Sequence, residues 1–142
     1  MTHWIDKTFA LAMHERQLAE HGGSSGVRDE SLLDSALARP QQLHAYGDPA
    51  PDLAALAASL AFGLARNHPF VDGNKRTAHV CYRVFLAING ADLDSSDEDK
   101  YVAMLSLAEG SLDEVGFAGW LRQRIRPATG RRVHEKRARY PR

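Results

Sequence analysis

The stretch from Leu53 to about Asn67 constrains the fold of this chain more than any other, because it contains the most apolar run of the sequence, Leu53 to Ala65. Alanine and leucine dominate it, and Asp52 directly before it is a candidate helix cap. Pro69 follows it closely and disfavours helical geometry at the preceding residue. The stretch therefore predicts a helix that is buried on most sides and that is too short to cross a bilayer.

Helical periodicity with clear stop signals also marks the chain before this stretch. A first helix is expected to end at the glycine pair 22–23, and Asp29 can cap a second helix that stops before Pro40. The stretch 40–51 contains three prolines and Gly47, so we expect a loop or a short β-hairpin there. This part of the chain thus supplies two helices and a possible hairpin ahead of the buried helix.

The chain after the buried stretch predicts further helices and shows no convincing alternation typical of a strand. A helix is expected to begin near Asn74 and to end at the Asn-Gly pair 89–90, a common left-handed helix end. Ser96 and Ser111 each resemble the first residue of a capping box, so they would open two more helices. Pro127 should halt the last of them. The fold class that follows is all-α, a single helical bundle.

Length and charge divide the chain into a domain and a tail. The 142 residues suit one domain with one core, and we assign residues 1–126 to it. Residues 127–142 form a basic tail that we expect to be poorly ordered. Such a tail either is solvated, which we favour, or contacts nucleic acid or an acidic partner. The charges from residue 122 onward are Arg122, Arg124, Arg126, Arg131, Arg132, Lys136, Arg137, Arg139 and Arg142, against Glu135 alone.

The cysteine content and the first residues bear on the cellular setting. Cys81 is the only cysteine, so neither an intrachain disulfide nor a cysteine-based metal framework is possible. The first six residues lack the basic start and apolar run of a signal peptide. We therefore expect a cytoplasmic protein that contacts no membrane.

The segment 68–76 combines the groups needed for phosphate chemistry at a turn that feeds into a helix. The first backbone N–H groups of a helix have no intrahelical partner, and together with the helix dipole they form an anion site. Gly73 lets a phosphate approach the backbone, whereas Lys75 and Arg76 place positive charge where the dipole disfavours it. Two cations at a helix start make sense if an anion binds there.

Four further residues complete this candidate site. His68 can accept a proton from a hydroxyl at neutral pH, and Asp72 offers the hard oxygen ligand that suits Mg²⁺. Asn74 either donates to a phosphate oxygen or holds the turn, and Phe70 is expected to anchor the turn to the core. Each residue alone has a plain structural explanation, so the hypothesis depends on their combination within nine residues.

The sequence HPFVDGNKRTA resembles the signature of the Fic/Doc family, H-x-F-x-(D/E)-(G/A)-N-(G/K)-R, at every defined position. The resemblance spans roughly residues 4–121, so it implies the helical fold of that family with a short flap before the central helices. It also implies that His68 is the general base on a target hydroxyl, that Asp72 holds Mg²⁺, and that other motif residues bind the phosphates of ATP. These phosphate-binding residues are Gly73, Asn74, Lys75 and Arg76.

Two departures from the Fic pattern resemble the death-on-curing (Doc) branch of the family. Lys75 stands where Fic AMP transferases carry glycine, and His79, which we expect to pack, stands where they carry a second arginine. The Doc resemblance implies a toxin that transfers the terminal phosphate of ATP to a Ser or Thr hydroxyl of a cellular protein, with a translation elongation factor as first candidate. AMP transfer and a catalytically silent partner in an antitoxin–DNA complex are the alternatives.

The resemblance also implies how the activity is regulated and where the target docks. Many Fic proteins carry an inhibitory helix with the pattern (S/T)-x-x-x-E-(G/N), but the only candidate here, Glu109, has Leu105 four residues earlier. An antitoxin is therefore expected to supply an inhibitory segment in trans, with nucleic acid bound only indirectly through that complex. The segment 41–47 corresponds to the flap, so His44 and Tyr46 are candidate target contacts; a simple connecting loop is an equal alternative.

Overall fold

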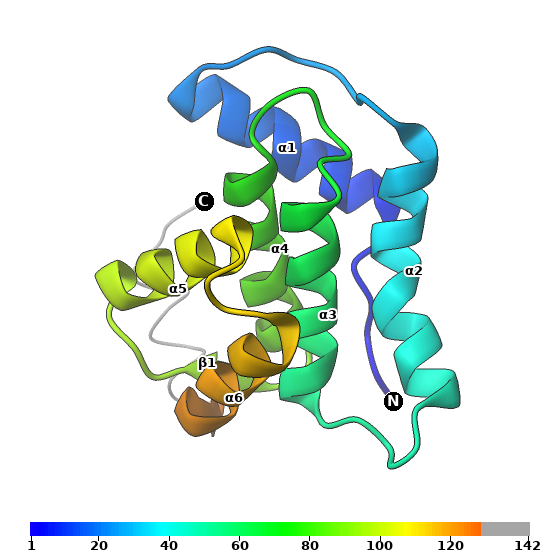
Figure 1. Ribbon diagram of the computed structural model, residues 1–142, viewed down its shortest axis with the longest axis vertical. Helices are drawn as coiled ribbons and strands as arrows, with labels where there is room; N and C mark the ends of the chain where they lie inside the picture. The colour runs from blue at the N-terminus through cyan, green and yellow to red at the C-terminus, as the bar shows by residue number, and fades with distance from the viewer. Residues whose placement is uncertain (129–142) are drawn as a thin grey trace.

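The computed structural model describes residues 1–128 as a bundle of six helices with two short strands (Figure 1). The all-α prediction is therefore confirmed. Residues 129–142, which include most of the predicted basic tail, lie outside the described residues. In chain order the elements are α1 (Lys7–His21), α2 (Glu30–Tyr46), α3 (Leu53–Arg66), α4 (Asn74–Ile88), β1 (Ala91–Leu93), α5 (Asp97–Glu109), α6 (Glu114–Arg124) and β2 (Ile125–Pro127).

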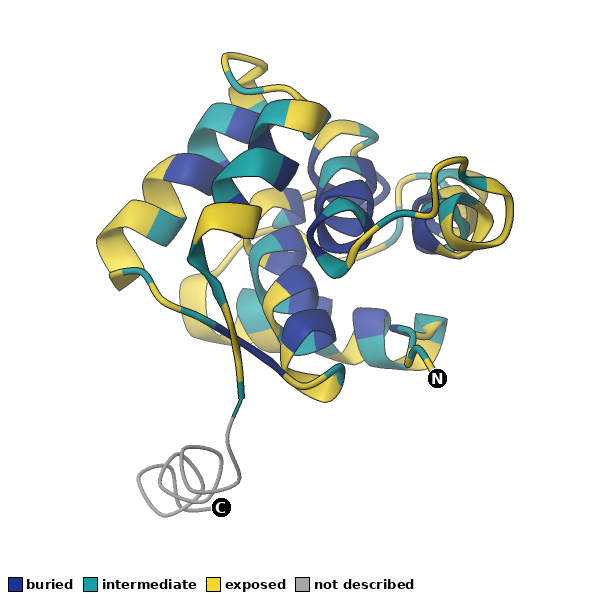
Figure 2. Ribbon diagram, turned by 90° about the horizontal axis from the view of Figure 1, so that it is seen from below, coloured by how far each residue is buried: buried dark blue, intermediate teal, exposed yellow. Residues whose placement is uncertain are grey.

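Helix α3 lies at the centre of the bundle, in contact with α2, α4, α5 and α6. Asp52 caps it by accepting a hydrogen bond from the Ala55 N–H at 2.9 Å, and most of its residues are buried, as predicted. Gly63 lets α2 approach closely, because a Cβ there would lie 3.0 Å from the Ala36 Cα. Figure 2 shows the buried residues gathered inside the bundle. Neither α3 nor any other helix within residues 1–128 is long and apolar enough to cross a membrane.

Helix α2 corrects the expectation of a loop or β-hairpin over residues 40–51. The helix continues through Pro40 to Tyr46 and ends at Gly47, whose N–H donates to the Leu43 carbonyl at 2.8 Å. A proline inside a helix removes one hydrogen bond and costs about 3 kcal/mol. The apolar face of α2 keeps its three-to-four spacing across the proline, and its burial against α3 outweighs that cost. The segment predicted as a flap is therefore largely helical.

Two three-residue strands, which the sequence analysis did not predict, pair in antiparallel register. Ala91 faces Pro127, and Leu93 faces Ile125. The last helix ends at Arg124 because the chain then turns extended to pair with β1, instead of remaining helical up to the proline. Strands this short show too little alternation to be recognised from the sequence.

The start of α6 differs from the predicted capping box. Asp113 caps the helix by accepting a hydrogen bond from the Gly116 N–H at 2.7 Å. The Ser111 hydroxyl instead donates to the Ser106 carbonyl at 3.3 Å. The prediction was wrong by two residues, because Asp113 offers a carboxylate directly before the helix. The other predicted caps are confirmed, namely Asp29, Asp52 and Ser96.

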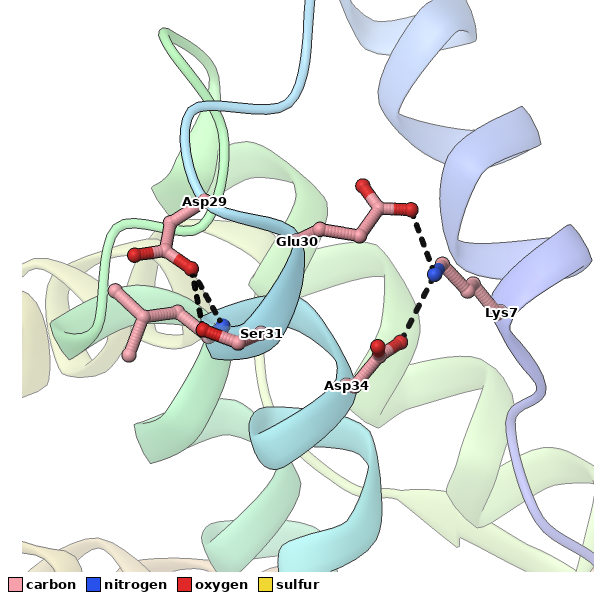
Figure 3. A network of polar contacts seen from close by, with 6 residues as sticks. Lys7, Asp29, Glu30, Ser31 and Asp34 are labelled. Carbon is pink, nitrogen blue, oxygen red and sulfur yellow. Dashed lines mark hydrogen bonds and ion pairs between the residues drawn. The ribbon is translucent and has the colours of Figure 1, made fainter.

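Helix α1 is tied to α2 through Lys7, whose ammonium nitrogen lies 2.7 Å from Glu30 and 2.9 Å from Asp34 (Figure 3). Beside this pair, Asp29 accepts hydrogen bonds from the Ser31 hydroxyl and from the first turn of α2. Exposed ion pairs of this kind contribute little stability each. They join the start of α1 to the start of α2, and α1 also contacts α4, where the candidate site begins.

Candidate functional site

The predicted phosphate turn lies where the chain leaves α3 and enters α4 (Figure 1). Gly73 precedes α4 with a positive φ of 78°, which suits a residue without a Cβ. No side chain among the described residues caps this helix, and its first turn holds the exposed Lys75 and Arg76 without an acidic residue. An anion at this helix start would meet backbone N–H groups, the positive end of the helix dipole and two cations.

Phe70 and Asn74 hold the turn from the inside. The Phe70 side chain is only 1% exposed, so its predicted burial is observed. The Asn74 amide oxygen accepts from the Phe70 N–H at 2.9 Å, and the Asn74 amide nitrogen donates to the Phe70 carbonyl at 3.0 Å. Asn74 is itself buried, so of its two predicted roles the geometry supports holding the turn.

His14 of α1 supports the same turn, and the sequence analysis missed it. Its side chain is 3% exposed, and its Nε2 lies 2.7 Å from the carbonyl oxygen of Asp72. The imidazole also stacks on the Phe70 ring, with ring centres 3.8 Å apart and planes inclined by 7°. The available signal was a histidine on the buried face of the first helix, four residues after the buried Ala10.

The segment between α1 and α2 covers another side of the turn. Arg28 donates from Nε to the His68 carbonyl at 2.7 Å and from Nη2 to the Asn67 carbonyl at 2.9 Å. Val27 and Phe70 form an isolated antiparallel bridge. These contacts hold His68 in a left-handed conformation, with φ at 51°, that is uncommon for a residue with a Cβ. The sequence alone indicated no role for Arg28.

Asp72 projects from the turn with an exposed side chain. One carboxylate oxygen accepts from the Gly73 N–H at 2.8 Å, and the other accepts from the Ser24 N–H at 3.3 Å. Gly23 passes so close that a Cβ there would lie 2.7 Å from the Asp72 Oδ2. Within residues 1–128, no three His, Cys, Asp or Glu side chains gather as a metal cage. A metal ion at Asp72 would therefore need substrate ligands, as is typical of Mg²⁺ bound to phosphates.

A cavity of about 630 Å³ lies beside the turn, a volume typical of small-ligand sites. His68, Asp72, Lys75 and Arg76 all line it, so the structure brings together the residues predicted for proton transfer, metal binding and phosphate binding. The His68 side chain is exposed rather than packed inward. Helix α5 supplies an apolar wall through Met104.

Residues 4–86, more than half of the chain, match the Fic/DOC family. The chain belongs to the Fic/Doc family. It is 40% identical over 128 residues to Toxin Doc of Mycolicibacterium smegmatis, a match that covers 83% of this chain and 95% of that protein. It is 33% identical over 88 residues to Protein kinase doc of Escherichia phage P1, covering 62% of this chain and 69% of that protein. The predicted resemblance to Doc-type toxins is thereby confirmed.

His79 stands at the position where the Fic pattern of the family has a second arginine. Burial, together with the positive charges of Arg83 and Lys100, lowers the pKa of the His79 imidazole to about 4. The imidazole is therefore neutral at neutral pH. Its ring packs edge-on against Tyr82 with ring centres 5.7 Å apart, as predicted, but the residue also lines the cavity.

The residues predicted for target docking lie away from the Fic/Doc motif. Tyr46 is 85% exposed in the last turn of α2, and the His44 ring meets the Trp4 ring edge-on at 5.4 Å. Neither His44 nor Tyr46 lines the cavity. The motif turn is instead covered by residues 22–29, at the opposite end of α2, so the structure does not bring the predicted flap to the motif.

Proposed function

We propose that this Fic/Doc protein is a toxin that transfers the terminal phosphate of ATP to a Ser or Thr hydroxyl of a cellular protein. The observation that carries the proposal is the uncapped start of α4, where Lys75 and Arg76 share one cavity with an exposed His68. A triphosphate is the kind of anion that such a helix start favours. ATP is therefore the co-substrate that we assign to the cavity, with Mg²⁺ as its metal ion.

The transfer step that we propose depends on His68. Its imidazole takes the proton of the target hydroxyl, and the hydroxyl oxygen attacks the γ-phosphorus of ATP. The bond from the γ-phosphorus to the oxygen bridging it to the β-phosphate breaks, so the products are the phosphorylated target and ADP. Lys75, Arg76 and the backbone amides of Asn74 and Lys75 hold the phosphate oxygens and neutralise the charge that develops on them. Gly73 leaves room for a phosphate beside the backbone, and its own N–H donates to the Asp72 carboxylate.

Asp72 is the residue that would hold Mg²⁺. Its carboxylate is exposed beside the cavity, and Mg²⁺ commonly binds one or two carboxylates together with substrate phosphates. When bound, the metal ion would neutralise negative charge on the phosphates. The Ser24 N–H bonds one oxygen of Asp72, so the segment before α2 helps to orient this ligand.

Two residues favour phosphate transfer over AMP transfer. Lys75 places a long cation where AMP-transferring Fic proteins carry glycine. His79 is neutral at neutral pH where those proteins carry an arginine. The phage P1 relative is named a protein kinase, which supports the same activity for this chain.

The proposal includes a setting for the activity. The relative from M. smegmatis is named a toxin, and a toxin inside its own cell requires a neutralising partner. We therefore propose an antitoxin protein that inhibits the site in trans, with DNA bound only through that complex. The target would be cytoplasmic, and a translation elongation factor is the first candidate.

Two labelling positions on ATP test the reaction. The purified protein is incubated with a cell lysate and with ATP that is labelled on either the γ- or the α-phosphate. Phosphate transfer predicts a labelled protein only with the γ-label, whereas a labelled protein with the α-label identifies AMP transfer and overturns the kinase assignment. A protein that modifies nothing and does not slow growth contradicts the transferase proposal.

His68→Ala tests the proton acceptor. General-base catalysis contributes about 10²- to 10⁴-fold to a rate, so transfer should fall by that factor and growth inhibition should be relieved. Thermal unfolding should remain cooperative, because the His68 side chain is exposed. Glu15→Gln, at an exposed position of α1, is the matched control and should behave as the parent. A fully toxic His68→Ala protein shows that His68 is not the base.

A further inference from the structure

We propose that His14, which lies outside the family motif, is a positioning residue that fixes the orientation of the Asp72–Gly73 peptide in the phosphate turn. The effect of His14 on catalysis rests on the proposed phosphate transfer. The effect of His14 on the geometry of the turn does not depend on that function. The side chain is 3% exposed, so protein and not solvent surrounds it.

Two contacts and one close approach join His14 to the turn. Its Nε2 lies 2.7 Å from the carbonyl oxygen of Asp72. Its ring lies flat on the Phe70 ring, 3.8 Å away, and Phe70 is the residue that anchors the turn in the core. Gly73 is so close that a Cβ there would lie 3.6 Å from two atoms of the His14 ring. One imidazole therefore contacts the Phe70 ring and the Asp72 carbonyl and lies beside Gly73.

The hydrogen bond between His14 and Asp72 has only one possible direction. A carbonyl oxygen accepts and cannot donate, so the Nε2 of His14 must carry the hydrogen. This holds for the neutral Nε2–H tautomer and for the doubly protonated ring alike. The proposed role therefore depends on a donor at this atom and not on the charge of the ring.

This hydrogen bond determines how the Asp72–Gly73 peptide is turned. A trans peptide is planar, so its C=O and N–H groups point in opposite directions. Because the Asp72 carbonyl points at His14 on α1, the Gly73 N–H points away from α1, and there it donates to the Asp72 carboxylate at 2.8 Å. His14 thus orients both the first amide of the phosphate turn and the carboxylate that we assign to Mg²⁺.

Two substitutions separate the hydrogen bond from the ring stacking. His14→Phe keeps an aromatic ring on Phe70 but has no donor for the Asp72 carbonyl. His14→Gln loses the ring but places an amide N–H as many bonds from the Cα as Nε2 is. The hydrogen bond to the Asp72 carbonyl should therefore be kept in His14→Gln and lost in His14→Phe.

Steady-state kinetics of phosphate transfer give the first readout. His14→Phe should lower kcat by about 10- to 100-fold while KM for ATP changes by less than about 3-fold, because small displacements of reacting groups have effects of this size. His14→Gln should return kcat to within about 5-fold of the parent, because the donor is restored. Glu15→Gln, the exposed neighbour in α1, is the control and should match the parent.

Nuclear magnetic resonance gives a second readout that needs no activity. In the parent, the imidazole ¹⁵N spectrum should show the His14 hydrogen on Nε2. In His14→Phe the Asp72 and Gly73 amide signals should shift or exchange faster with solvent, whereas His14→Gln should keep them near their parent positions. A hydrogen on Nδ1 alone, or parent-like kcat and amide signals in a folded His14→Phe protein, overturns the inference. A parent that transfers no phosphate contradicts the proposed function, and the spectra still decide the role of His14.

Discussion

Five of the six helices within residues 1–128 begin in one way, and the remaining helix begins in another. Each of the five follows a side chain that accepts a hydrogen bond from a backbone N–H of the first turn. Helix α4 instead follows Gly73, which has no side chain to accept this bond, and Lys75 and Arg76 stand in its first turn. The five capping residues are Asp6, Asp29, Asp52, Ser96 and Asp113.

The difference separates helix starts that stabilise the fold from one that is available to a ligand. A side-chain cap contributes about 1 kcal/mol, and an acidic residue in the first turn contributes about 0.3–1 kcal/mol more. Helix α5 has three acidic residues in its first turn, whereas α4 has none. The chain thus omits the stabilising arrangement at the helix start that lies beside the cavity of about 630 Å³, as expected for a binding site.

Lys75→Glu gives the start of α4 a negative charge like that at the other helix starts. It should lower the activity and raise the stability. The value of kcat/KM for ATP should fall by about 100-fold, because a carboxylate repels the phosphates that the cation attracts. The free energy of unfolding should rise by about 0.3–1 kcal/mol through the helix dipole. Steady-state kinetics and denaturant unfolding measure the two quantities.

Glu98→Lys makes the reciprocal change in the first turn of α5 and is the matched control. It should lower the free energy of unfolding by about 0.3–1 kcal/mol and leave kcat/KM unchanged. The comparison fails if Lys75→Glu is less stable than the parent and still fully active.

Asp52→Ala removes the cap of α3 and should affect stability alone. The free energy of unfolding should fall by about 1–2 kcal/mol, because the Ala55 N–H loses its acceptor. Asp52→Asn should lose less, since asparagine also caps helices and gives up only the exposed ion pair with Arg122. Denaturant unfolding gives both values, and transfer by both proteins should match the parent at temperatures where they are folded. Equal stability of Asp52→Ala and the parent would show that capping is not what this helix start supplies.

The smallest expected effect is the pH dependence of the stability that Asp52 contributes. Hydrogen bonds from Arg122 lower the pKa of the Asp52 carboxyl below its ordinary value of 3.8. Such a group stabilises the fold above its unfolded pKa and loses that contribution as the pH falls through the lowered value. The Tm difference between the parent and Asp52→Asn should therefore be largest near neutral pH and shrink below about pH 4. The corresponding difference in the free energy of unfolding should stay within about 1 kcal/mol, because the Asp52 side chain is 48% exposed. A Tm difference that grows as the pH falls contradicts the lowered pKa of Asp52.

The helices and the motif could be predicted from the sequence because their signals are local. A cap such as Asp52 acts on an N–H three residues away, and the glycines after α1 stop the helix directly. The motif likewise fits within residues 68–76, so the sequence alone showed the cations beside the candidate base.

The features that were missed depend on contacts between distant parts of the chain. Helix α2 continues through Pro40 because α3, which follows it in the chain, buries the apolar face of α2. Strand β1 exists only through its pairing with residues 125–127. His14 acquires its role from Asp72, and nothing near position 14 in the sequence indicates that partner.

The left-handed backbone at His68 carries a consequence for how this protein would respond to laboratory evolution. Glycine fits such a φ without steric cost, whereas a residue with a Cβ gives up about 1–2 kcal/mol there. The turn therefore holds two sources of instability within nine residues, the strained histidine and the open helix start. A library screened for heat resistance alone should accumulate substitutions in this turn, and its most robust survivors should be the most harmless to the host cell.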